Sequence, residues 1–275
     1  MNTGEIRSKL IQMGQDPKKS LGQHFLTSEA VVKKMVKVAQ ISPEDTILEI
    51  GPGLGILTRE LAASPTKRLY LCEKDHKLCD QIKGEFIQNK MKIICDDALL
   101  LIPNLQVESP FKVVSNLPYN VGAPILISLL TICPTLPQKI VVMLQKEVAQ
   151  RICAKPGDSN RGLLTVLIEL YGEASIVEKV PSNLFYPVPQ VDSAVLLIDE
   201  ITPIEFNPKV VIRTIKMAFS GKRKKLKNSI FSTLKILPKE MEQITQKAGV
   251  SPDQRPEDLN RDQWIGLIRE LLLRD

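Results

Sequence analysis

The segment "NLPY" at residues 116–119 places an amide, a rigid proline and an aromatic ring in four consecutive positions. It directly follows "FKVVS" at 111–115, a β-branched run with the composition of a buried strand. The side-chain oxygen of Asn116 and the carbonyl of Pro118 could each accept a hydrogen bond from the exocyclic amine of a nucleobase. Two such bonds would free the lone pair of that nitrogen, and Tyr119 would offer a face for base stacking. The alternative is an Asn-containing turn with an incidental tyrosine.

A glycine-rich loop after an earlier strand-like run predicts a second part of the same site. The sequence "ILEIGPGLGILT" at 47–58 places Gly51, Gly53 and Gly55 between a strand and a helix, where backbone N–H groups can bind an anion. Ile56 stands where the dinucleotide-binding pattern requires a small residue, which disfavours NAD without excluding it. The loop therefore suits a small carboxylate, such as the amino-acid end of S-adenosylmethionine.

Two carboxylates end the next strand-like runs and extend this predicted site. Glu73 follows "RLYLC" at 68–72, and Asp97 follows "MKIIC" at 91–95. At such strand ends a carboxylate can bind the ribose hydroxyls, and an acceptor can bind the amino group of adenine. Each residue alone would be interpreted as a solvated loop carboxylate, but their register at successive strand ends favours one cofactor-binding crevice. Such a crevice would catalyse in-line methyl transfer by positioning, without a metal ion.

Short β-branched runs alternate with segments of helical length from residue 46 onward. This alternation predicts an α/β fold with right-handed βαβ units and a doubly wound, mostly parallel sheet. The parallel strands are expected at 46–50, 68–72, 91–95, 111–115 and 139–144. Two later runs, 174–180 and 193–199, are expected to form its antiparallel edge. Only helical patterns follow, so we predict a flexible segment at 1–17, a catalytic domain at 18–202 and a helical domain at 203–275.

The helical domain carries a basic stretch. Residues 206–239 contain no acid, and the whole chain has a net charge of +6. A charge run is usually a solvated surface, and a localisation signal is a further alternative. The lack of compensating acids favours contacts with RNA phosphates, and the low aromatic content (4%) favours recognition of RNA shape and backbone. The predicted RNA-binding residues are Lys222, Arg223, Lys224, Lys225 and Lys227.

The cysteines and the hydropathy pattern indicate the compartment. The five cysteines are odd in number and lack C-x-x-C spacing, which predicts reduced thiols in a cytosolic protein. No apolar run is long enough to span a bilayer, and the first residues contain no signal-peptide pattern. The sequence therefore predicts a cytoplasmic protein with no membrane contact, and nothing in it indicates an obligate oligomer, so we expect a monomer.

Five motifs together resemble those of the KsgA family, the small-subunit rRNA adenine dimethyltransferases. These are "DPKKSLGQHFL", "EIGPGLGILT", "NLPYN", "MLQKEVAQR" and "FYPVPQVDSAV". The related Erm methyltransferases of large-subunit rRNA share some of them, but "MLQKEV" and "PQVDSAV" favour KsgA. The resemblance runs from about Lys18 to Val195 and continues into the basic C-terminal helices. It implies a Rossmann-like methyltransferase fold and S-adenosylmethionine-dependent conversion of two adjacent adenosines, near the 3′ end of small-subunit rRNA in a ribosomal particle, into N6,N6-dimethyladenosines.

The resemblance also implies roles for individual residues. It places cofactor contacts at His24, Leu26, Gly51, Glu73, Asp97 and Asn116. Tyr119 and Phe185 would hold the target base, although the prolines around Phe185 could simply shape a loop. Many bacterial members have Asn at the position of His24, so the cofactor contact there could come from the backbone or from the imidazole.

Three other functions remain as alternatives. A non-catalytic RNA-binding assembly factor could retain this fold, although the intact Glu73, Asp97, Asn116 and Tyr119 argue against it. An NAD oxidoreductase is disfavoured by Ile56 and by the lack of an obvious acid for hydride transfer. Erm-type methylation of large-subunit rRNA is the nearest catalytic alternative.

Overall fold

The computed structural model describes residues 1–18, 21–86, 89–221 and 223–274. They form two compact units, which are described separately. One contains residues 1–149 and 173–201, and the other contains residues 150–172 and 202–275. Within the described ranges, no helix has the length and apolar composition required to cross a membrane.

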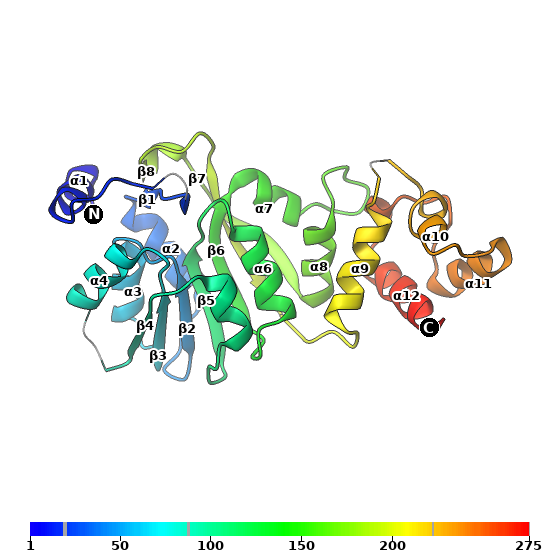
Figure 1. Cartoon of the computed structure of the whole chain (residues 1–275), viewed down its shortest axis with the longest axis horizontal. Helices are drawn as coiled ribbons and strands as arrows, with labels where there is room; N and C mark the ends of the chain where they lie inside the picture. Colours follow the sequence, from blue (N-terminus) through cyan, green and yellow to red (C-terminus); the bar gives the residue numbers. More distant parts are fainter. Residues whose placement is uncertain (19–20, 87–88, 222, 275) are drawn as a thin grey trace. The chain divides into compact units, whose positions relative to one another are not determined.

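The first unit is built on a seven-stranded sheet with the order β4-β3-β2-β5-β6-β9-β7 (Figure 1). The strands are β2 (Thr46–Ile50), β3 (Arg68–Cys72), β4 (Met91–Ile94), β5 (Phe111–Asn116), β6 (Lys139–Gln145), β7 (Glu173–Val180) and β9 (Ser193–Asp199). The first five are parallel, and β9 and β7 join them in antiparallel pairing. The predicted α/β class is therefore confirmed. The order along the sheet reverses between β2 and β5, and ligands of such folds bind at this switch point.

Helices cover both faces of this sheet (Figure 1). Residues of α2, α3 and α4 share one apolar core cluster with the inner strands, because each helix buries an apolar stripe, such as Val31, Val32 and Met35 of α2. The opposite face is covered by α6, whose mostly apolar sequence suits a buried helix. The helices are α2 (Glu29–Ala39), α3 (Ile56–Ala63), α4 (His76–Glu85), α5 (Ala98–Leu101), α6 (Gly122–Thr131) and α7 (Lys146–Ile152), with a 3₁₀ turn, η2 (Ile102–Asn104).

The N-terminal residues differ from the prediction of an irregular, flexible segment at 1–17. Helix α1 (Thr3–Gln12) begins with a capping box in which Asn2 and Glu5 bond each other's backbone N–H groups. Ile6 and Leu10 lie one turn apart on one face and are buried in a cluster with Phe25, Leu54 and Leu78 of α4. Two apolar residues make a weak periodic signal, so tertiary packing rather than sequence pattern accounts for this helix.

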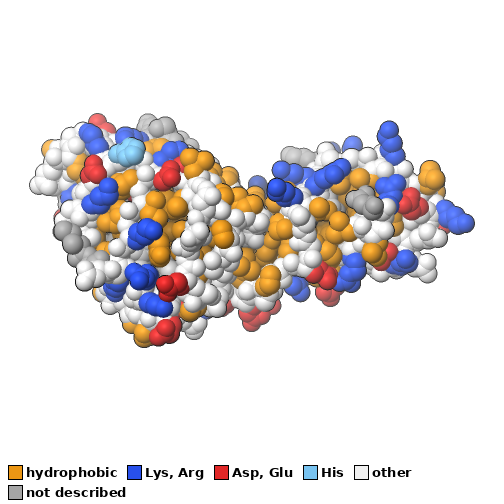
Figure 2. All heavy atoms as spheres, turned by 60° about the horizontal axis from the view of Figure 1, so that its bottom comes forward, with side chains coloured by type: hydrophobic (Ala, Val, Ile, Leu, Met, Phe, Trp, Pro, Cys, Tyr) orange, Lys and Arg blue, Asp and Glu red, His pale blue; other side chains and the backbone are white. Residues whose placement is uncertain are grey.

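The described residues of the second unit form helices and loops, with no strand. It contains α8 (Leu163–Tyr171), α9 (Pro208–Ala218), α10 (Ile230–Thr233), α11 (Pro238–Ala248) and α12 (Arg261–Leu272), with 3₁₀ turns η4 (Leu226–Asn228) and η5 (Pro256–Asp258). Figure 2 shows Lys and Arg side chains spread over this unit, at the right of that view, with acidic side chains among them.

The sequence prediction placed residues 150–172 in the catalytic domain, whereas the structure places them in the helical unit. Helix α8 packs against α9 and α12. The buried Arg161 strengthens this association, since its guanidinium donates to the carbonyl of Leu259 at 2.9 Å and to Glu169 at 2.6 Å. In the sequence α8 lies between two strands of the sheet, so the pattern suggests a crossover helix. The other boundary falls between Ile201 and Thr202.

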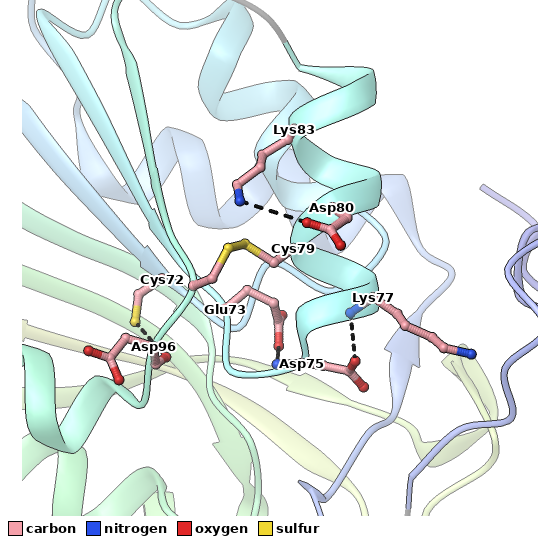
Figure 3. Close-up of a disulfide and its surroundings, with 9 residues drawn as sticks. Cys72, Glu73, Asp75, Lys77, Cys79, Asp80, Lys83 and Asp96 are labelled. Atoms are coloured by element: carbon pink, nitrogen blue, oxygen red, sulfur yellow. Dashed lines mark hydrogen bonds and ion pairs between the residues drawn. A yellow bond between two sulfur atoms is a disulfide. The ribbon is translucent and has the colours of Figure 1, made fainter.

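Two cysteines depart from the prediction of five reduced thiols. Cys79 on α4 and Cys95, directly after β4, form a disulfide (Figure 3), while Cys72, Cys133 and Cys153 are free. The 16-residue separation of the pair matches no common motif. Pairing became possible only because α4 packs beside β4, which brings the two Cα atoms to 5.9 Å.

Reduction of this disulfide is expected to destabilise the first unit. A cross-link that closes a 16-residue loop restricts the unfolded chain, so its loss should lower the free energy of unfolding by about 3 kcal/mol. Denaturant unfolding with and without dithiothreitol measures this difference. In the Cys95→Ala variant dithiothreitol should have no effect, and a wild-type protein equally insensitive to it would contradict the prediction.

Candidate active site

One cavity at the carboxyl ends of β2, β3 and β5 collects most of the predicted site residues. Its lining includes His24, Leu26, Gly51, Glu73, Asp97, Asn116, Pro118 and Tyr119. These residues are distant in the sequence, but the strands that precede them are parallel neighbours, so their ends meet at one edge of the sheet. Phe185 is absent from this lining.

The glycine loop approaches two other parts of the site closely. Gly51 and Gly53 have φ angles of 68° and 58°, in the left-handed region that favours glycine. A Cβ atom at Gly53 would lie 3.2 Å from the ring of Phe25, and one at Gly51 would lie 3.4 Å from the ring of Pro118. The loop therefore needs glycine for its turn at both positions, and at Gly53 also for its close contact with Phe25.

Glu73 is held by two backbone bonds. Its Oε2 accepts from Gly53 N–H at 3.1 Å, and its Oε1 accepts from Asp75 N–H at 2.9 Å. Burial raises the pKa of this carboxyl, and the two backbone bonds oppose that shift. Each carboxylate oxygen has two lone pairs, so both retain capacity for a ligand hydroxyl.

Asp97 has a cationic partner that the sequence did not reveal. Its Oδ1 caps α5 by accepting from Leu99 N–H at 2.9 Å, and its Oδ2 lies 2.7 Å from Lys74 Nζ. The hydrogen bond from Lys74 is the largest cause that holds the pKa of Asp97 below its usual value. Lys74 directly follows Glu73, so this ion pair links the ends of β3 and β4 at the cavity wall.

The "NLPY" segment leaves its predicted acceptors accessible. The backbone N–H of Leu117 donates to Met143 at 3.0 Å, which continues the sheet past Asn116. The side chain of Asn116 makes no hydrogen bond to any described residue. Pro118 differs in that its carbonyl already accepts from Val121 N–H at 3.2 Å. A carbonyl oxygen has a second lone pair, so one further bond remains possible.

Tyr119 is fixed among aromatic and polar neighbours. Its hydroxyl bonds that of Ser193, its ring stacks on His24 with a centroid distance of 5.3 Å, and it meets Phe185 edge-on at 6.4 Å. Phe185 itself is only 2% exposed and belongs to the apolar core. The expectation that Phe185 presents a free face to the base is therefore not met, and its ring instead supports Tyr119.

His24 joins two loops through its side chain. The imidazole Nδ1 donates to the carbonyl of Pro187 at 2.7 Å, since a carbonyl can only accept. The residues that follow His24 form β1 (Phe25–Leu26), which pairs with β8 (Phe185–Tyr186). Strand β8 directly follows a 3₁₀ turn, η3 (Ser182–Leu184). The imidazole thus ties the two segments together beside the cavity.

Glu49 is a site residue that sequence reasoning missed. It precedes the glycine loop on β2, lines the cavity and is 1% exposed. Burial raises its pKa to about 8, against the opposing hydrogen bond from Thr58 Oγ1 at 2.8 Å. The available signal was a carboxylate at an interior position of a strand whose other residues are buried.

The predicted RNA-binding residues belong to the helical unit. Lys225 and Lys227 each place Nζ 2.8 Å from Asp253, whose pKa their hydrogen bonds lower to about 2. Arg223 and Lys224 are exposed, and no described acid pairs with them. Lys222 lies outside the described residues. The basic stretch contains no acid, but the fold brings Asp253 to it from a distant loop.

Comparisons with known proteins agree with this architecture. Residues 14–272 match the ribosomal RNA adenine dimethylase family. Two proteins called ribosomal RNA small subunit methyltransferase A are similar. That of Prochlorococcus marinus is 36% identical over 93% of this chain and 91% of its own length. That of Clostridium botulinum is 38% identical over 96% of both.

Two solved structures share the fold. A dimethyladenosine transferase from Plasmodium falciparum has a TM-score of 0.74 and 24% identity, over 91% of this chain and 98% of its own. The 23S rRNA methyltransferase ErmE has a TM-score of 0.67 and 25% identity, over 90% of this chain and 99% of its own. The predicted Rossmann-like methyltransferase fold with C-terminal helices is thereby confirmed.

Proposed function

The chain belongs to the ribosomal RNA adenine dimethylase family, and from this premise we propose that it methylates two adjacent adenosines near the 3′ end of small-subunit rRNA, using S-adenosylmethionine. It is an rRNA adenine dimethyltransferase, and its predicted resemblance to the KsgA family is confirmed. The small-subunit substrate is supported by relatives of that name at 36–38% identity, against 25% for ErmE. The cavity that gathers Asn116, Glu73 and Asp97 is the observation that carries the proposal.

The donor set of the cavity fits S-adenosylmethionine. Gly51 and Gly53 make a tight turn at the start of α3, which suits the carboxylate of an amino acid. Glu73 can accept from ribose hydroxyls and Asp97 from the amino group of adenine. Leu26 lies on the apolar wall. When bound, the cofactor supplies a methyl group on a positively charged sulfur.

The protein's own part in the reaction is to hold the target adenine. Tyr119, fixed by Ser193 and His24, gives the base a rigid stacking face. Asn116 Oδ1 and the carbonyl of Pro118 accept the N6 hydrogens and so turn the nitrogen lone pair toward the methyl donor. Neither oxygen is a strong base, so the proton released after transfer passes to water, and the rate gain comes from orientation.

The helical unit is proposed to contact rRNA phosphates through Arg223 and Lys224, and through Lys222, Lys225 and Lys227 of the same stretch. In the variant Arg223→Ala/Lys224→Ala, the slope of log K against log salt should become about two units shallower, because two phosphate contacts are lost. Filter binding over a salt series measures this slope.

The matched control is Lys225→Ala/Lys227→Ala. Asp253 already neutralises part of that charge, so this pair should change the slope by less than the first pair. Equal slopes for the two double variants would refute the proposed difference.

We further expect a cytoplasmic monomer that acts on a ribosomal particle.

Labelled S-adenosylmethionine with unmethylated small- and large-subunit particles tests the function. Dimethyladenosine at adjacent positions near the 3′ end of small-subunit rRNA is the expected product. Label in large-subunit rRNA would favour the Erm-type function, and binding without transfer would favour an assembly factor.

A further inference from the structure

Asp75 is a buried carboxylate for which the proposed chemistry has no use. Its side chain is 1% exposed, yet it has several partners, of which Figure 3 shows Lys77. Its Oδ1 accepts from the backbone N–H of Lys77 at 3.1 Å, which caps α4. Its Oδ2 accepts from Gln15 Nε2 at 2.7 Å and from Gln23 Nε2 at 3.0 Å, and it lies 2.8 Å from Lys18 Nζ. Three donors from one N-terminal segment thus converge on a single oxygen.

The backbone of Asp75 connects this cluster to the cofactor cavity. Its N–H donates to Glu73 Oε1 at 2.9 Å, on the carboxylate proposed to bind ribose. Burial acts to raise the pKa of Asp75, but the hydrogen bonds from Lys18, Gln23 and Gln15 outweigh it and keep the pKa below its usual value. The carboxylate therefore stays charged, and its bonds are of the stronger, charge-assisted kind.

The segment held in this way forms a wall of the cavity. Leu21, Gly22 and Gln23 line it, followed by His24 and β1. Gly22 has φ of 64°, and a Cβ atom there would lie 3.4 Å from the backbone nitrogen of Tyr119 and 3.3 Å from Asn120 Oδ1. Any shift of the segment would thus disturb both the cofactor cavity and the "NLPY" segment.

We propose that Asp75 is a positioning residue, whose carboxylate fastens residues 15–18 and 21–23 against the cofactor cavity through Gln15, Lys18 and Gln23. This inference rests on the proposed function in so far as the cavity binds S-adenosylmethionine. The simpler alternative is that Asp75 only caps α4.

The variant Asp75→Ser separates these two roles. Serine is as good an N-cap as aspartate, so α4 should be retained and the helical signal in circular dichroism should change little. The serine hydroxyl is too short to bond Gln15, Lys18 and Gln23 together. Loss of charge-assisted bonds should then raise the Kd for S-adenosylmethionine by about 10- to 100-fold in calorimetry. An unchanged Kd would leave only the capping role.

Lys18→Met tests the same contact from the other side, because Lys18 does not line the cavity. It should also raise the Kd, and the double variant with Asp75→Ser should lose less affinity than the sum of the two single changes. Additive losses would show that the two residues act independently and would overturn the proposal.

Limited trypsinolysis tests the fastening without cofactor. Cleavage after Lys18, identified by mass spectrometry, should be at least about tenfold faster in Asp75→Ser than in wild type, because loss of the ion pair with Asp75 frees the Lys18 side chain for the protease. Equal cleavage rates would refute the fastening. A wild-type protein that binds no S-adenosylmethionine would instead refute the proposed function, while the cleavage rates would still decide the role of Asp75.

Discussion

Replacing Asn116 with alanine is expected to lower the single-turnover rate of methyl transfer by about a thousandfold, the upper range for loss of one preorganised polar group in an active site. The side chain lies at the end of β5 in the cavity and makes no hydrogen bond to any described residue. Its oxygen is therefore available to orient the adenine nitrogen. Rates should be measured with saturating cofactor, because Asn116 is also a proposed cofactor contact.

Affinity for rRNA should stay close to the wild-type value, since the proposed phosphate contacts lie on the helical unit. Asn116→Asp provides a matched comparison, because it keeps an oxygen acceptor of the same size while adding a charge. It should retain more activity than Asn116→Ala. Methylation by Asn116→Ala at a rate near that of wild type would remove Asn116 from the mechanism.

The sheet and the position of the site follow from patterns that are local in the sequence. Each predicted parallel strand is a short run rich in apolar residues, and the side chains that follow such runs must meet at one edge of a parallel sheet. For this reason Gly51, Glu73, Asp97 and Asn116 could be assigned to one cavity before their distances were known.

Features that depend on tertiary contacts were missed or misassigned. The pairs Cys79–Cys95 and Lys225–Asp253 join residues with no recognisable spacing. Phe185 was expected to hold the target base together with Tyr119. Strand β8 instead directs the ring of Phe185 into the core, and of these two residues only Tyr119 lines the cavity. A sequence shows which residue types follow a strand, but not which face a paired two-residue strand presents.

Glu49 leads to the second large effect, a stability that falls as pH rises. Burial raises the pKa of Glu49 from 4.5 to about 8, and the negative charge of Glu73 adds to the shift. Below pH 4.5 both the folded and the unfolded states hold this proton. Between pH 4.5 and 8 only the unfolded state releases it, so the free energy of unfolding should fall by about 1.4 kcal/mol per pH unit from this residue. Above pH 8 the contribution is lost.

Glu49→Gln should abolish this dependence, because glutamine can still accept from Thr58 but does not ionise. The free energy of unfolding of the variant is expected to match that of wild type near pH 5 and to exceed it by about 4 kcal/mol at pH 8 in urea unfolding. Glu44 is exposed, so Glu44→Gln should follow the wild-type curve throughout. If Glu49→Gln and wild type instead gave parallel curves from pH 5 to 8, the carboxyl of Glu49 would have to be ionised in the folded protein, and the predicted fall in stability would be wrong.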